Sequence, residues 1–529
     1  STLFTILGLV GIAALLIVPL FGRQDGVPLE RKCSGPEIRR LVLWCAAASV
    51  LHLLVVLSSP VVFASGDSTS YLLKAVSLAE HGTFDTGGYE YEINRTPGYP
   101  AFVAAIFRVF GPHLTMVALV QWLLFCSSIT LLALSLTSLV PLRWLIPASF
   151  LAILSPAQIW NVRCLLTEST FTSAAALSMA AWFQHLRSAG WRSWVWLGVF
   201  ALLTSVTCYI RPNGVILWAA VVPVYVPGLL ARIAPSNSWR ATLLPALRYS
   251  CPYILAGMVV VLAIGAWSLR NYSSRMYFGF TDIGGIARTV GLTGSGIFDA
   301  RSLIPLNAYE AYAIGRYRTN YRYPMWYIRK KLYFDMSENG MKPPADAVPR
   351  LDAQVRQFTR DSIRRVPLSA HIAATLRLLN WSFLFPAITT YDQEPIRGNY
   401  ARFRNYADIH ALRSGEIAYC SPNLVYDERR ENWLFDRFAD VVPVYEKGYY
   451  VFLVAAYLSA VVLSFGRKGA LAAPMWVFLA NLVLIASLLN TNARYIQVLD
   501  WLLFYQCALV LSARPVKAEA AIPEPAGAK

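Results

Sequence analysis

Long apolar runs separated by shorter polar segments make up most of the chain. Most of these runs reach the roughly 20 residues that a helix needs to cross the apolar core of a bilayer. The pattern predicts a polytopic α-helical membrane protein with about eleven transmembrane helices. The expected spans are 3–21, 40–59, 113–139, 143–155, 169–186, 193–210, 213–231, 250–268, 448–466, 470–489 and 496–513.

The polar segments divide the chain between these spans. In the first outer loop, 60–112, Leu72, Val76 and Ala79 recur at helical spacing. They predict an amphipathic helix that begins near Ser68 and lies along the membrane. We expect a transmembrane module over 1–268, an outer α or α/β domain inserted over 269–447, further transmembrane helices over 448–513 and a disordered cytoplasmic tail over 514–529.

Composition and charge give the protein an orientation. The 529 residues are 56% hydrophobic with a formal net charge of +17. Basic residues gather in alternate short loops, such as the one that holds Arg31 and Arg40, and the positive-inside rule puts these loops in the cytoplasm. No basic stripe marks a compact domain, so the expected partners include membrane lipids but not nucleic acid. The outer, periplasmic face of a cytoplasmic (inner) membrane then receives residues 60–112, 156–168 and 269–447.

The sequence does not favour a metal or nucleotide site. Its eight cysteines include no CxxC pair, and its six histidines show no ligand spacing. There is no GxxxxGK[ST] motif, and the Gly-rich stretch 283–296 lacks the strand and helix of a dinucleotide site. We therefore expect no cofactor and no metal.

Two acidic residues lie where the chain meets the membrane on the outer face. Asp67 opens the predicted helix of the first outer loop, and Glu168, in LLTESTF, opens a span. Each has a structural explanation, because a carboxylate at a helix start caps the helix or complements its dipole. Each also has a functional one, because two carboxylates on one surface can divide the tasks of taking a proton and orienting a nucleophile.

Basic residues accompany these acids on the same face. Arg95 lies in NRTPGYP, where two prolines and Gly98 predict a rigid turn as the chain re-enters the membrane. Lys74 follows Asp67 by two helical turns, on a similar face of the predicted helix. Arg95 is either an interfacial side chain that snorkels to the headgroups or part of a site.

Three arginines mark outer ends of later spans. Arg211, Arg270 and Arg494 are either interfacial anchors or, together, a group that binds the phosphate of a lipid-linked substrate. Asp500 lies inside the last span, where it either pairs with an arginine or lines a cavity.

The order of these motifs is similar to that of a known superfamily. The chain reads GDS, RTPGYP, LLTESTF, YIRPNG, LRNY and ARY, over residues 60–275 and again around 488–500. This series resembles the GT-C integral-membrane glycosyltransferases of the protein O-mannosyltransferase and lipid A aminoarabinose transferase type. The resemblance implies a polyprenyl-monophosphate-linked sugar as donor. It also implies an extracytoplasmic protein, lipid or glycan as acceptor, and direct inverting displacement without a metal.

The resemblance also implies roles for individual residues. Asp67 matches the catalytic base, and Glu168 matches the second acidic residue of the site. The expected substrate-binding residues are Lys74, Arg95, Tyr99, Arg211, Arg270, Arg494 and Tyr495. The chain departs from the family pattern in its extra first span, 3–21, and in the lack of a second acid beside Asp67.

Two other functions stay open. A transporter or flippase for a lipid-linked saccharide needs the same cationic surfaces, but its unusual polar residues lie near the bilayer midplane. An oligosaccharide polymerase or ligase would use the tyrosine- and arginine-rich segment 309–335. The polar residues here gather at one membrane face, which favours the glycosyltransferase.

Overall fold

The computed structural model describes residues 33–58, 67–84, 95–233, 239–275, 278–281, 469–487 and 499–513, together with residues 369, 455 and 456. These parts of the chain are helical and contain no strand. The expected span 3–21 and the tail 514–529 lie outside them, as do nearly all of the block 269–447 and of the span 448–466.

The helices follow one another closely along the described chain. In order they are α2 (Gly35–Leu57), α3 (Asp67–His81), α4 (Gly98–Phe110), α5 (Leu114–Leu136), α6 (Leu142–Ile153), α7 (Pro156–Arg163), α8 (Thr167–Arg187), α9 (Trp191–Ile210), the 3-10 helix η2 (Pro212–Ala220), α10 (Val222–Ile233), α11 (Trp239–Arg275), the 3-10 helix η5 (Gly469–Ala472), α20 (Ala473–Ser487) and α22 (Trp501–Ala513).

Several of these helices are able to cross a membrane. Within the described residues, α2, α5, α9 and the part of α11 from Leu243 to Ser274 are long and apolar enough by themselves. The pairs α6–α7 and η2–α10 meet the same criterion when taken together, with bends of 44° and 48°. The predicted spans 40–59, 113–139, 193–210 and 250–268 are thus confirmed as apolar helices, and the expected total of about eleven remains a prediction.

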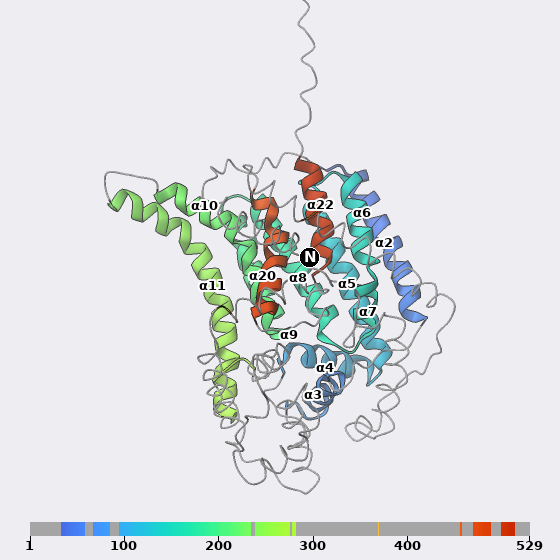
Figure 1. Ribbon diagram of the computed structural model, residues 1–529. Helices are drawn as coiled ribbons and strands as arrows, with labels where there is room; N and C mark the ends of the chain where they lie inside the picture. Colours follow the sequence, from blue (N-terminus) through green and yellow to red (C-terminus); the bar gives the residue numbers. More distant parts are fainter. Residues whose placement is uncertain are drawn as a thin grey trace, which may run out of the picture.

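The helices form a bundle with two further helices across one end. Figure 1 shows α2, α5, α6, α8, α9, α20 and α22 side by side, α11 packed at the edge of the bundle against α9, and α3 with α4 crossing the lower end. Apolar side chains such as Phe125, Phe171 and Phe200 are fully buried where α5, α8 and α9 pack. The serines and alanines of α8 allow these neighbours to approach closely, which explains its central position.

The helix predicted in the first outer loop is confirmed. α3 begins at Asp67, one residue before the predicted start, and buries Leu72, Ala75 and Val76 against the rest of the protein. It packs directly against α4. Arg108 near the end of α4 donates hydrogen bonds to the carbonyls of Leu78 and Ala79 in the last turns of α3.

The segment 156–168 differs from the expected outer loop. It opens with helix α7, whose Gln158 and Arg163 are buried. Proline is well tolerated in the first turn of a helix, because its missing N–H would have no partner there. Pro156 therefore starts a second helix after the break at Leu154–Ser155 and does not lead into a loop.

The expected span 213–231 is also not one straight helix. Its first half is the 3-10 helix η2, and α10 follows at the 48° bend. Pro212 starts η2, and a Cβ at Gly214 would lie only 2.6 Å from the backbone nitrogen of Cys208. The glycine thus lets the chain fold back tightly against the end of α9.

Candidate active site

The first contact of the candidate site joins the start of α4 to the first turn of α3. Nε of Arg95 donates a 3.1 Å hydrogen bond to Oγ of Ser70. The guanidinium also lies 4.9 Å from the ring centroid of Tyr71, and only 8% of Arg95 is exposed. Asp67 is the first residue of α3, so Arg95 is held one helical turn from its backbone.

The start of α4 is also docked on the last residues of α9. Oγ1 of Thr96 donates a 2.7 Å hydrogen bond to the carbonyl of Ile210. A Cβ at Gly98 would lie 2.6 Å from the carbonyl carbon of Tyr209 and 2.7 Å from the nitrogen of Ile210. Gly98 is the first residue of α4, so it is needed for this close approach and not for the turn expected from its motif.

Gly98→Ala tests this contact. Backbone cannot move aside like a flexible side chain, so the methyl group forces α4 away from α9 and we expect a loss of about 1–3 kcal/mol. The measurement is the melting temperature of the purified protein in detergent. Gly198→Ala is the control, since nothing lies within 4 Å of a Cβ there and alanine favours the helix. Equal melting temperatures for the two variants would contradict the docking.

A buried ion pair joins α8 to the residue after α9. Nη1 of Arg211 lies 3.1 Å from Oε1 of Glu168, and their side chains are 9% and 1% exposed. Oγ1 of Thr167 donates a 3.3 Å hydrogen bond to Oε2 of Glu168, and the Arg211 guanidinium lies 5.7 Å from the Phe171 ring centroid. Glu168 is in the first turn of α8, where the helix dipole also favours a carboxylate.

Gln121 of α5 links α4 to the chain just before Glu168. Its Oε1 accepts a 2.8 Å hydrogen bond from the hydroxyl of Tyr99, and its Nε2 donates to the carbonyls of Val162 at 2.7 Å and Cys164 at 3.2 Å. Burial raises the pKa of Tyr99 well above its usual range, and the nearby Glu168 adds to this effect, so the phenol remains a donor. The side-chain amide of Gln121 thus holds both α4 and the segment before Glu168 in place.

Gln121→Leu is expected to destabilise the protein by about 2–4 kcal/mol. The leucine has a similar volume but leaves the Tyr99 hydroxyl and two carbonyls without the amide, and each unsatisfied buried group costs about 1–3 kcal/mol. The melting temperature in detergent measures the effect. Tyr99→Phe in the same assay is expected to cost less, about 1–3 kcal/mol, because it leaves only Oε1 of Gln121 without its partner. A leucine variant as stable as the wild type would show that the network contributes nothing.

Arg270 reaches the same end of the bundle from the last turns of α11. Its guanidinium lies 4.9 Å from the ring centroid of Trp267. The Trp267 ring lies 5.7 Å from that of Phe84, after α3, and 6.1 Å from that of Tyr209, near the end of α9. Arg270 is partly exposed, and its Nη1 donates to Asn271 at 3.4 Å.

The other expected site residues have varied positions. Lys74 and Tyr99 are both fully buried, so neither presents an exposed side chain for substrate. The side chain of Asp67 lies outside the described part of the chain, as do Arg494 and Tyr495 entirely, and their roles stay predictions. The structure thus places Arg95 against the first turn of α3, pairs Glu168 with Arg211, and holds Arg270 beside Trp267.

Asp500 has its partners in α7. Its two carboxylate oxygens accept hydrogen bonds from Oγ of Ser155 at 2.9 Å and from Nε2 of Gln158 at 2.8 Å, and the residue is fully buried. These contacts join the start of α22 to the helix that leads toward Glu168. Among the described residues, no group of three His, Cys, Asp or Glu side chains is placed to hold a metal ion.

Comparisons with known proteins give matches among solved structures only, since no family model and no curated protein matches the chain. ArnT from Cupriavidus metallidurans in the apo state has a TM-score of 0.36 and 14% identity, over 90% of this chain and 77% of that one. The same enzyme bound to undecaprenyl phosphate gives 0.33.

Two further solved structures are similar to the chain. The Archaeoglobus fulgidus oligosaccharyltransferase has a TM-score of 0.32 and 12% identity, over 79% of this chain and 57% of that one. The arabinosyltransferase EmbB from Mycobacterium smegmatis has 0.31 and 16%, over 87% and 45%.

Proposed function

We propose that the protein is a membrane glycosyltransferase that moves a sugar from a polyprenyl-monophosphate donor to an acceptor outside the cytoplasmic membrane. The observation that carries the proposal is the meeting of separate motifs at one end of the bundle. RTPGYP touches the first turn of α3 through Arg95 and the end of α9 through Thr96. LLTESTF and YIRPNG meet through the pair of Glu168 and Arg211.

Asp67 acts as the general base in this proposal. It takes the proton of an acceptor hydroxyl while the hydroxyl oxygen bonds to the anomeric carbon of the sugar. A single displacement of this kind inverts the configuration at that carbon. Arg95, held one turn away from Asp67, supplies a positive charge that favours the ionised carboxylate.

The bond that breaks joins the anomeric carbon to the phosphate, and the products are the glycosylated acceptor and the polyprenyl phosphate. Negative charge grows on the leaving phosphate, and guanidinium groups stabilise it by charge-assisted hydrogen bonds. We assign this task to Arg270, which is partly exposed at the same end of the bundle. Arg494 would join it.

Glu168 and Arg211 have a different role, because each is buried against the other. We assign Glu168 to the orientation of Arg211, and through it to the orientation of the acceptor and donor groups. A preorganised charge pair of this kind costs no rearrangement when the reaction begins. Lipid-phosphate donors carry their own leaving group, so the proposal needs no nucleotide site.

Reconstituted vesicles provide the test. The purified protein is placed in vesicles with a polyprenyl phosphate that carries a labelled sugar, and membrane extract supplies the acceptors. We expect release of unlabelled polyprenyl phosphate together with label on a second product. Movement of label across the bilayer with the sugar–phosphate bond intact would identify a flippase and overturn the proposal.

A further inference from the structure

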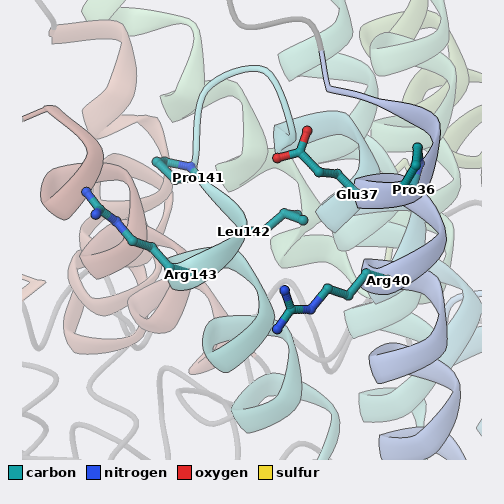
Figure 2. A pocket seen from close by; sticks show the side chains of 6 residues that line it. All are labelled: Pro36, Glu37, Arg40, Pro141, Leu142 and Arg143. Atoms are coloured by element: carbon teal, nitrogen blue, oxygen red, sulfur yellow. The ribbon is translucent and has the colours of Figure 1, made fainter.

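The end of the bundle opposite the candidate active site carries an open pocket. It lies between the first turns of α2 and α6, the two helices that pack together there, and has a volume of about 570 Å³. Figure 2 shows the six side chains that line it, Pro36, Glu37 and Arg40 from α2, and Pro141, Leu142 and Arg143 at the start of α6.

The walls of the pocket are fixed by the helix starts. The backbone N–H and the hydroxyl of Ser34 donate to Oε2 of Glu37 at 2.9 and 3.1 Å, which caps α2. On the other wall, the carbonyl of Pro141 accepts hydrogen bonds from the backbone N–H groups of Trp144 and Leu145 at 3.0 and 3.1 Å. The pocket is therefore part of the folded bundle.

The charge of the pocket is suited to an anion. Arg40 and Arg143 are both exposed, and Arg40 extends from α2 toward α6 while Arg143 lies on the far side of α6 (Figure 2). The single carboxylate is that of Glu37, and one of its oxygens is used by the cap of α2. Two arginines thus line the pocket, one on each side of the start of α6, and one oxygen of the Glu37 carboxylate is already hydrogen-bonded in the cap of α2.

The surroundings indicate that the anion belongs to a lipid. Directly along α2 from the pocket lie Val42, Leu43 and Trp44, which are exposed large apolar side chains. The Trp44 ring packs edge-on against that of Phe150 of α6, with the ring centroids 6.5 Å apart. A ligand with a charged headgroup and apolar chains matches both the polar pocket and the apolar face of α2 beside it. A free anion would contact only the pocket.

We propose that this pocket binds the phosphate headgroup of an anionic membrane phospholipid. Basic pockets at the ends of transmembrane helices bind such headgroups because each guanidinium near the surface adds to the attraction. The acyl chains lie along the apolar face of α2. This site is independent of the sugar-transfer site, from which the length of the bundle separates it.

Native mass spectrometry of the detergent-solubilised protein tests the site with phosphatidylglycerol as the probe. The double variant Arg40→Gln/Arg143→Gln is expected to bind it about 30-fold more weakly than the wild type, at roughly a factor of five for each guanidinium. The matched control is Arg39→Gln/Arg192→Gln, which removes two exposed arginines outside the pocket. It is expected to change the affinity less than threefold.

Three outcomes would overturn the proposal. Equal losses in the two double variants would show that only overall charge matters. Equal affinity of the wild type for phosphatidylglycerol and phosphatidylcholine would show that the pocket does not recognise the negative charge of the headgroup. Displacement of the lipid by an equal concentration of inorganic phosphate would identify the pocket as a site for a free anion. The melting temperature of both variants confirms that they are folded.

Discussion

Asp67→Asn is expected to slow sugar transfer by about 100- to 10,000-fold, the usual contribution of a general base. The amide of asparagine cannot take the proton of the acceptor hydroxyl at neutral pH. Asp67 is the first residue inside α3 and not its N-cap, and asparagine has nearly the same size and shape as aspartate, so α3 keeps its start and the protein keeps its melting temperature. The measurement is kcat and KM with a polyprenyl-phosphate sugar, and the loss should fall on kcat.

Glu80→Gln is the matched control for that experiment. It neutralises another carboxylate of α3, near the opposite end of the helix and 44% exposed. We expect this variant to transfer sugar at the wild-type rate. An Asp67→Asn variant that is folded and equally fast would show that Asp67 is not the general base.

Breaking the pair of Glu168 and Arg211 should have the largest effect on stability. Removal of one partner from a buried pair leaves the other charge in a region of low dielectric, at a cost of about 3–5 kcal/mol. We expect both Glu168→Gln and Arg211→Met to show this loss as a lower melting temperature and a poor yield in detergent. Both should also lose sugar transfer.

The double variant Glu168→Gln/Arg211→Met separates structure from chemistry. It removes both charges, so most of the lost stability should return, as is seen when buried pairs are replaced by uncharged side chains. Transfer should stay low, because the orienting charges are gone. A double variant that is both stable and fully active would leave the pair with a structural role only. The exposed pair of Glu80 and His81 is the control, with no change expected.

The sequence predicted that Glu168 and Arg211 lie at the same end of the bundle, where the candidate active site is. The order of the apolar runs and the charges of the loops place Glu168 and Arg211 on the same side of the membrane. Counting the spans along the chain is sufficient for this prediction. The ion pair between them needs more, because it depends on the lateral packing and rotation of α8 against α9. Hydrophobic patterns fix how deep a residue lies in the membrane, but not which neighbour it meets across the bundle.

Residues inside apolar runs were harder to predict. Gln121 is a lone amide in the apolar run 113–139. A buried polar group in a span needs hydrogen-bond partners, so its presence there indicates a contact with other polar groups but does not identify them. The sequence predicts a polar region over 156–168 on the outer face, and its pattern does not show that the polar side chains of α7 are covered by other helices. They are buried, and Gln158 uses its polarity to hold Asp500.

Gly98 shows another limit of reading from sequence. In PGYP a glycine between two prolines suggests a turn. The structure puts it at the start of a helix, where the lack of a side chain admits the backbone of α9. Only the tertiary contact separates the two explanations.

The docking of α4 on α9 also sets the time at which the site can form during synthesis. The hydrogen bond from Thr96 to Ile210 joins residues 114 positions apart. At the roughly 5–20 residues per second of translation, about 6–23 s pass between the synthesis of Thr96 and that of Ile210. The amphipathic character of α3 and α4 lets them rest at the bilayer surface during this interval. A chain that stops before Ile210 therefore carries both helices at the membrane but no assembled site.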